Sequence, residues 1–305
     1  MTDYELATIS QTETVWLAPF LGLPTELTAA AGSQGLSSPW KVEAFADYVP
    51  TEGDIFVSTY ARSGTNWTMQ IAHQIAHYGE ATFDHIHDVV PWPESTTPNI
   101  VPLSDWSAQE RSPTGLRVIK THLESHRVPY NESAKYVTVV RDPKDVFVSS
   151  YFFCGMAFTV DEWLDFFLSG SFRLGSWPEH TAGYWSWLAH PNVLVLTFDE
   201  MVRDLPAMVR RISDLMDVKL TGAQLDRVIA KSSFRYMKAI DRRFSPPMVS
   251  LGGNGHETVI VRSGKIGEYI QVINREQQAR IDQFCTSELR RLGSDFPYRE
   301  LFAAT

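Results

Sequence analysis

Residues 55–67, with the sequence IFVSTYARSGTNW, decide the fold class. The apolar run at 55–57 is typical of a buried strand, and the residues after it are typical of a tight basic turn that leads into a helix. Unpaired backbone N–H groups and the positive end of the helix dipole make such a turn an anion-binding site, which Gly64 lets an anion approach closely. The side chains that add hydrogen-bond donors are Arg62, Ser63, Thr65 and Asn66.

The turn differs in register from the P-loop of nucleoside-triphosphate-binding proteins. Thr59 stands where that loop begins with glycine, Thr65 stands where it has lysine, and Asn66 replaces the hydroxyl that binds magnesium. The pattern therefore predicts an anionic nucleotide that is handled without a metal ion.

Composition limits the classes of protein and partner. With 305 residues, of which 44% are hydrophobic, the chain can bury a sizeable core, and we expect one α/β domain. A formal net charge of −9 argues against a nucleic-acid polymer as partner. The two cysteines, Cys154 and Cys285, are both expected in helices, so neither a disulfide framework nor a cysteine metal site is predicted.

The N-terminal residues lack a basic segment followed by a long apolar run, so no secretory signal is expected. Since no later run approaches the roughly 18 apolar residues of a membrane span, we expect a cytoplasmic protein without a membrane partner. Residues 1–44 are expected to form an extension that covers a pocket, and residues 45–305 to form the domain.

Strand-like and helix-like segments alternate along that domain, which predicts a central parallel sheet flanked by helices on both faces. The expected strands are 54–59, 116–120, 136–141 and 193–197. The expected helices are 66–78, 143–154, 161–169, 178–189, 206–216, 221–231 and 274–292. The proline-rich stretch 84–115 is expected to be irregular, and 244–258 is expected to form a hinged lid.

Three further segments carry candidate site residues. Arg141 ends one strand, with Ser149 about two helical turns later, and Lys120 and His122 end another. Ligands bind at this edge of α/β sheets. Taken singly, Arg141 has an ordinary interpretation as an ion pair with Asp142, and His122 as a structural histidine. The third segment is the basic, glycine-containing turn at 261–269.

Together these segments resemble the cytosolic-type sulfotransferase family, which transfers a sulfonate from 3′-phosphoadenosine 5′-phosphosulfate (PAPS) to a hydroxyl or amine. Residues 58–67 are similar to the family's STYPKSGTTW loop, and residues 120–123 match KTHL. Residues 140–151 are similar to VRNPKDVAVSYY, and residues 262–268 to RKGxxGD. The resemblance covers about residues 45–282 and implies a P-loop-like fold.

The resemblance also implies roles for individual residues. Residues Arg62, Ser63, Gly64, Thr65 and Asn66 would hold the 5′-phosphosulfate. Trp67 and Phe234 would stack on adenine, and Ser232 would bond its amine. Arg141, Ser149, Arg262, Ser263 and Gly264 fall at the positions for the 3′-phosphate. His122 would take the acceptor's proton, and Lys120, with Arg62, would stabilise charge on the sulfonate.

Some positions depart from the family pattern. Arg62 and Ser263 each stand where the family has lysine, and Phe198 replaces a tyrosine. These changes leave open a second hypothesis, a nucleotide-binding protein with impaired catalysis. A third, a kinase that binds ATP and magnesium, is disfavoured by Thr65 and Asn66.

Aromatic side chains near the loops expected to cover His122 favour a small, partly apolar alcohol, phenol or amine as acceptor. They are Trp92, Trp106, Phe153 and Phe158. No metal site is predicted, because the pair His73 and His77 lacks the glutamate of a zinc protease, and His85 and His87 lie in the proline-rich stretch. The sequence leaves the oligomeric state open.

Overall fold

The structure, a computed structural model, describes residues 43–95, 97, 99–155, 158–169, 176–245 and 259–302. Only the last two residues of the expected N-terminal cover and the first two of the expected lid are among them. The rest of both segments lies outside the described residues.

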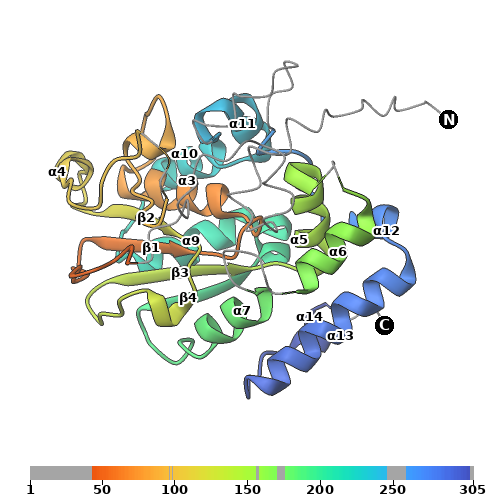
Figure 1. Cartoon of the computed structure of the whole chain (residues 1–305). Helices are drawn as coiled ribbons and strands as arrows, with labels where there is room; N and C mark the ends of the chain where they lie inside the picture. The colour runs from red at the N-terminus through yellow and green to blue at the C-terminus, as the bar shows by residue number, and fades with distance from the viewer. Residues whose placement is uncertain are drawn as a thin grey trace, which may run out of the picture.

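Four parallel strands form the centre of the molecule, in the order β2-β1-β3-β4 (Figure 1). They are β1 (Asp54–Ser58), β2 (Arg117–Thr121), β3 (Lys135–Val140) and β4 (Val193–Thr197). Ile55 pairs with Val118 on one side and with Lys135 on the other, and Tyr136 pairs with Val193. The parallel sheet and all four expected strands are confirmed, each within one residue at either end.

The seven expected helices are present with small shifts at their ends. They are α3 (Thr65–Ala76), α5 (Pro143–Ser150), α6 (Val160–Leu168), α7 (Trp177–Trp185), α9 (Leu205–Leu215), α10 (Gly222–Lys231) and α13 (Arg275–Arg291). Beyond Ser150 the chain continues as a π-helical turn, Tyr151–Gly155. A capping box opens α13, because Asn274 and Gln277 exchange hydrogen bonds of 2.9 Å.

Short helices were not predicted. They are α4 (Ser107–Arg111), α8 (Phe198–Arg203), α11 (Phe234–Ala239), α12 (Tyr269–Val272) and α14 (Tyr298–Leu301). Each has six residues or fewer, too few to give a clear helical period. A 3₁₀ turn, Ile86–Asp88, and α4 interrupt the proline-rich stretch that was expected to be irregular throughout.

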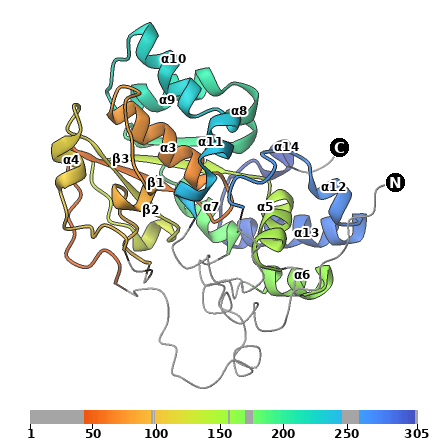
Figure 2. The ribbon, with the colours of Figure 1, turned by 90° about the horizontal axis from the view of Figure 1, so that it is seen from above.

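Side chains of the strands point alternately to two hydrophobic layers. Ile55 and Val57 pack with residues of α3, α9 and α10, whereas Phe56 stacks on Tyr136 on the other face, where Trp187 covers them just after α7. Helices therefore flank the sheet on both faces, as expected. The carboxyl ends of the strands face α5, and α4 lies at the opposite end of the sheet (Figures 1 and 2).

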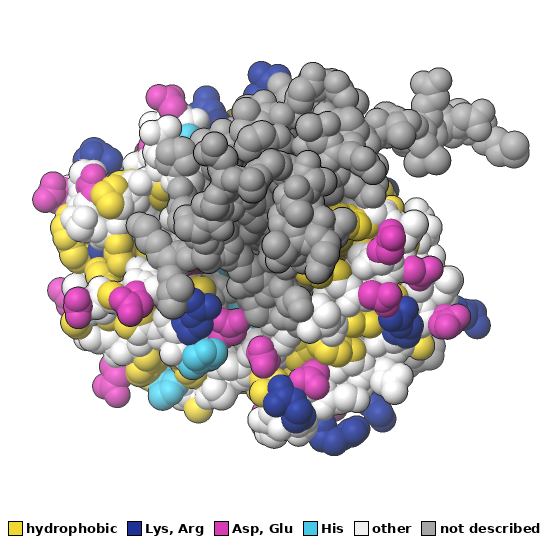
Figure 3. All heavy atoms as spheres, viewed as in Figure 1, with side chains coloured by type: hydrophobic (Ala, Val, Ile, Leu, Met, Phe, Trp, Pro, Cys, Tyr) yellow, Lys and Arg dark blue, Asp and Glu magenta, His cyan; other side chains and the backbone are white. Residues whose placement is uncertain are grey.

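No helix in the described ranges combines the length and the apolar character needed to cross a membrane. On the face drawn in Figure 3, basic and acidic side chains of the described residues are interspersed around the rim.

Candidate active site

The turn between β1 and α3 has the geometry of an anion site. Gly64 is the N-cap of α3 with φ 97°, and no side chain caps the helix there. The first backbone N–H groups of α3 are therefore available to a ligand. A Cβ on Gly64 would lie 3.1 Å from the ring of Phe198, so the backbone is packed closely here.

Arg141 joins this turn to a second one. One guanidinium nitrogen, Nη1, donates to the carbonyl of Arg62 at 3.1 Å, and Nη2 donates to the carbonyl of Lys265 at 3.1 Å. Its guanidinium also lies 4.4 Å from the ring centre of Phe198. The three separate segments that were predicted to bind the two phosphates are thus brought together at the carboxyl edge of the sheet.

Arg62 points toward the helix that follows β3. Its Nε donates to Ser149 Oγ at 3.1 Å, and its guanidinium lies 4.3 Å from the ring centre of Phe153. Arg62 has a φ of 68°, in the left-handed region. The arginine that stands in place of the family's lysine is therefore held by both Ser149 and Phe153.

Arg262 forms a two-pronged ion pair with Glu268. Nη1 donates to Oε1 at 2.6 Å and Nη2 to Oε2, and Ser263 Oγ also donates to Glu268 Oε2 at 3.0 Å. These bonds lower the pKa of the Glu268 carboxyl below its ordinary value. Asp145 fixes the segment 262–268, because its carboxylate accepts a hydrogen bond from the backbone N–H of Gly267 at 2.8 Å.

The residues expected around adenine also meet. Trp67 Nε1 donates to the carbonyl of Ser232 at 2.7 Å. Phe234, two residues later, packs against Gly264, where a Cβ would lie 2.8 Å from its ring. The adenine and 3′-phosphate segments are therefore in contact through Gly264 and Phe234.

His122 is buried and has a defined tautomer. Nδ1 lies 2.7 Å from the carbonyl oxygen of Thr59. Because a carbonyl only accepts, Nδ1 carries the proton and Nε2 carries the lone pair. The pKa of His122 is well below its ordinary value, mainly because the ring is buried and also because the charge of Lys120 is near. The ring is thus neutral near pH 7 and able to accept a proton at Nε2.

Lys120 is also buried, with Nζ 3.4 Å from the ring centre of Trp92. The pKa of its ammonium is lowered to about 7, chiefly by burial; the charge of Glu94 opposes this shift, and that of Arg62 adds to it. The edge of Trp92 also meets His122, with ring centres 5.6 Å apart. Trp92 and Phe153 therefore contact the residues at the centre of the predicted site.

Of the other two aromatic residues predicted for the acceptor pocket, Trp106 lies away from His122, and Phe158 packs with α6. Trp106 packs 3.7 Å from the guanidinium of Arg117, at the amino end of β2, whereas His122 follows the carboxyl end. Phe158 packs on Trp163 of α6, with ring centres 5.7 Å apart. The expectation that Trp106 lines the acceptor pocket is corrected by this placement, because the loop that carries it crosses to the opposite end of the sheet.

Sequence reasoning missed Glu94. Its carboxylate is fully buried, and Oε1 accepts from the backbone N–H of His122 at 2.7 Å and from Trp92 Nε1 at 2.8 Å. The stretch 84–115 has no periodic pattern that could place it. The one available signal was an acidic residue directly after the apolar sequence at 89–93.

The histidine pairs considered in the sequence, His73 with His77 and His85 with His87, have structural contacts within the protein. Within the described part of the chain, no group of three or more metal-binding side chains comes together. His73 and His77 pack ring to ring, 4.6 Å apart, and burial lowers the pKa of His73 to about 3. His85 and His87 each bond a backbone carbonyl, of Ser245 and Val90 respectively.

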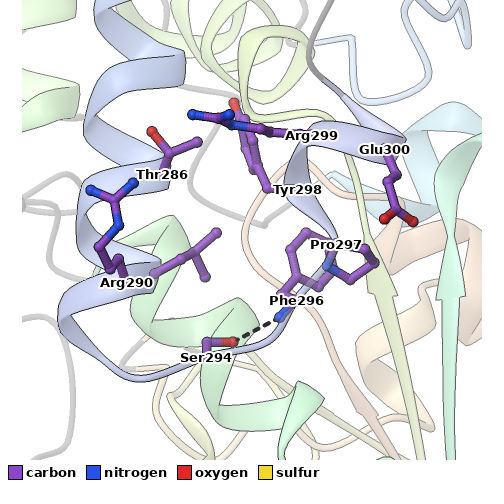
Figure 4. Close-up of a pocket in the computed structure, with 9 residues that line it drawn as sticks. Thr286, Arg290, Ser294, Phe296, Pro297, Tyr298, Arg299 and Glu300 are labelled. Carbon is purple, nitrogen blue, oxygen red and sulfur yellow. Dashed lines mark hydrogen bonds between the residues drawn. The ribbon is translucent and has the colours of Figure 1, made fainter.

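A hollow of about 350 Å³ lies away from His122, between α13 and α14 (Figure 4). Leu289, Phe296 and Pro297 line it, and Arg290 and Arg299 extend along it. Its lining shares no residue with the site around His122.

The predicted site contains buried polar atoms that lack partners among the described residues: Ser63 Oγ, Arg141 Nε, Ser232 Oγ and Arg262 Nε. Unpartnered buried donors are costly unless a ligand or water satisfies them. Their positions at the phosphate turn, at the second turn and beside Trp67 fit a ligand with two anionic groups and a polar ring.

Comparison with known proteins agrees with this geometry. Residues 52–293 match the family described as the sulfotransferase domain. An amine sulfotransferase of Oryctolagus cuniculus is 27% identical over 273 residues, 85% of this chain and 86% of the relative. Sulfotransferase 2A1 of Mus musculus is 32% identical over 232 residues, 73% and 79% of the two chains.

The fold is similar to that of retinol dehydratase in complex with retinol and PAP. The TM-score is 0.66 with 21% identity, covering 84% of this chain and 86% of that one. Since the family match spans most of the chain, the chain belongs to the sulfotransferase family, whose PAPS-dependent enzymes it resembles in sequence and in fold.

Proposed function

We propose that this enzyme transfers the sulfonate of PAPS to a hydroxyl or amine of a small, partly apolar acceptor in the cytoplasm, with His122 as general base and without a metal ion. The single observation that carries the proposal is the Nδ1 hydrogen bond of His122 to Thr59. It leaves Nε2 as the proton-accepting atom in a buried, neutral ring.

The residues present fit PAPS. Ser63, Gly64, Thr65 and Asn66 would hold the 5′-phosphosulfate with the backbone of the first turn of α3. Arg141, Ser149, Arg262, Ser263 and Gly264 would hold the 3′-phosphate, and Trp67, Ser232 and Phe234 would hold adenine. When bound, PAPS supplies the sulfonate and leaves as the bisphosphate nucleotide PAP.

Three side chains would then act in the transfer step itself. His122 Nε2 takes the proton of the acceptor hydroxyl, while Lys120 and Arg62 stabilise negative charge on the sulfonate oxygens. Such fixed cations act strongly in a site that excludes water. Because one sulfonate carries a single charge, ammonium, guanidinium and backbone donors suffice for in-line transfer.

The acceptor class is supported by Trp92 and Phe153, whose rings lie beside Lys120 and Arg62. The relatives point the same way: one is named an amine sulfotransferase, and retinol dehydratase is seen with the alcohol retinol. A panel of small phenols, aliphatic alcohols and amines is therefore the first acceptor screen.

Substitution of the base tests the proposal. His122→Ala should lower kcat by ~10²–10⁴-fold, the usual contribution of general-base catalysis, and should leave the affinity for PAP within about threefold, measured by calorimetry. A variant that turns over normally once saturated, or that loses PAP binding, would contradict the role of His122.

The second candidate is a nucleotide-binding protein with impaired catalysis. It is favoured by the engagement of Arg62 with Ser149 and of Arg262 with Glu268. Binding of PAP without sulfonation of any acceptor in the panel would support it. Stabilisation by ATP and magnesium in place of PAP, seen as a thermal shift, would support the kinase hypothesis instead.

A further inference from the structure

The segment 91–94 extends along the end of β2 and brings Glu94 beside the proposed catalytic residues. The backbone N–H of Lys120 donates to the carbonyl of Pro91 at 2.9 Å. Further along both segments, the backbone N–H of His122, two residues after Lys120, donates at 2.7 Å to Oε1 of Glu94, three residues after Pro91. Glu94 is therefore tied directly to the backbone that carries the base.

Trp92 connects Glu94 with Lys120. The indole N–H donates to Glu94 Oε1 at 2.8 Å, and the face of the same ring lies 3.4 Å from the Lys120 ammonium. One aromatic side chain thus separates a buried carboxylate from a buried cation. An indole that donates to a carboxylate has a more electron-rich face, which favours the cation.

Oε2 of Glu94 is buried and has no hydrogen-bond partner among the described residues. A buried carboxylate with one oxygen unsatisfied is unfavourable unless a nearby positive charge compensates it. Among the described residues, the groups that act electrostatically on Lys120 or are acted on by it are Glu94, Arg62, His87 and His122. Among these only Glu94 is acidic.

We propose that Glu94 is a positioning residue for the transfer reaction, whose carboxylate keeps Lys120 in the ammonium form and fixes the backbone of His122. The proposal rests on the proposed function, because Lys120 as a cation matters only if charge develops on a transferring group. It assigns the charge of the carboxylate to Lys120 and its hydrogen bonds to His122 and Trp92.

The two roles can be separated by one substitution. In Glu94→Gln the amide oxygen can still accept both hydrogen bonds, whereas the negative charge is gone. The charge of Glu94 raises the pKa of Lys120, and a nearby opposite charge shifts a pKa by ~1–3 units, so Lys120 should lose its proton at lower pH in the variant. Since the proposed transfer needs the ammonium, the alkaline limb of the pH–activity profile should lie at lower pH in the variant than in the wild type.

The experiment measures kcat/KM for PAPS from pH 5 to 9, which reports ionisations of the free enzyme. We expect the alkaline limb of Glu94→Gln to move down by at least ~1 pH unit, with PAP affinity within about threefold. Glu110→Gln, an exposed residue of α4, removes the same charge away from the site and should retain the wild-type profile. A lower kcat with an unmoved alkaline limb would overturn the proposal.

A second measurement does not depend on turnover. The rate at which an amine-specific reagent modifies Lys120, followed by mass spectrometry against pH, reports its free-amine fraction directly. We expect a midpoint at least ~1 pH unit lower in Glu94→Gln and a midpoint near the wild-type value in Glu94→Asp, which keeps the charge. Equal midpoints in the wild type and Glu94→Gln would overturn the proposal, even if no acceptor were sulfonated.

Should Glu94→Gln not fold, Glu94→Asp decides the question. A wild-type midpoint for Lys120 in that variant would support the role of the charge. A midpoint lowered by ~1 pH unit or more, despite the retained carboxylate, would refute it.

Discussion

Gly264→Ala tests how the adenine site is built, through a contact that the substitution creates. Gly264 has a φ of 61°, and a Cβ there would lie 2.8 Å from Cδ2 and 2.9 Å from Cε2 of Phe234. Both distances are too short for carbon atoms. Because Phe234 is 46% exposed, its ring can swing into solvent rather than force the turn apart.

The magnitude follows from two separate costs. An alanine in the left-handed region costs ~1–2 kcal/mol of folding free energy, which should lower the midpoint of thermal unfolding by a few degrees. Moving Phe234 removes one face of the adenine stack, and such stacking is worth ~1–3 kcal/mol per base. We therefore expect the Kd for PAP to rise by ~5–150-fold.

Calorimetry with PAP on four proteins checks this reasoning: the wild type, Gly264→Ala, Phe234→Ala and the double variant. If Gly264→Ala acts by displacing the ring, the double variant should bind PAP about as well as Phe234→Ala alone. The two changes would then be strongly non-additive.

The opposite result is equally clear. If Gly264→Ala weakened PAP binding by the same factor with and without Phe234, the effect would come from the turn that is proposed to hold the 3′-phosphate. An unchanged Kd in both single variants would refute the placement of adenine beside Phe234.

Further expectations concern one ion pair at the site and the stability of the fold. Glu268 competes with the proposed 3′-phosphate for the Arg262 guanidinium. Glu268→Gln should therefore raise the affinity for PAP, measured by calorimetry, by ~2–5-fold. Weaker binding would contradict this competition. In the wild type the buried Asp54 carboxylate lies 2.9 Å from Arg117 Nε, and Arg117→Met leaves it without this cation. Urea unfolding should show that the free energy of unfolding falls by ~3–5 kcal/mol. A decrease below ~1 kcal/mol would be inconsistent with a buried ion pair. Burial lowers the pKa of His180 from about 6.5 in the unfolded chain to about 3 in the folded one. Between these two pH values only the unfolded chain binds a proton at this histidine, so the free energy of unfolding decreases as the pH drops. His180→Gln should reduce that slope by up to ~1.4 kcal/mol per pH unit between pH 6 and 4, and an unaltered slope in urea titrations would count against a neutral, buried His180.

The sheet and the turn between β1 and α3 were predictable because their causes are local. Each strand contains successive apolar residues, such as Ile55, Phe56 and Val57 in β1, where all five residues are buried. The turn at 59–64 requires a glycine with positive φ at the N-cap, and Gly64 supplies it. Burial on both faces of a parallel sheet leaves few alternatives for such a pattern.

The surroundings of Lys120 were not predictable, because they depend on contacts between segments without a periodic pattern. Glu94 and Trp92 belong to a proline-rich stretch, and only the pairing of Pro91 with Lys120 brings them to the site. The same stretch carries Trp106 to the other end of the sheet. Composition predicted that aromatic rings line a pocket, but it could not predict which ones.

Arg62, which stands where the family has lysine, also shows the difference between what the local sequence predicts and what contacts between segments add. The sequence predicts a cation at this position, and the structure adds that its planar fork reaches across to Ser149 and lies on Phe153. A flexible lysine could offer neither the directed Nε bond nor a flat surface for stacking. Because Ser149 belongs to the proposed 3′-phosphate site, Arg62 links the two segments that are proposed to bind the phosphates. We therefore expect the proposed transfer to depend on the charge state of Lys120, which the carboxylate of Glu94 is proposed to set, as well as on Arg62.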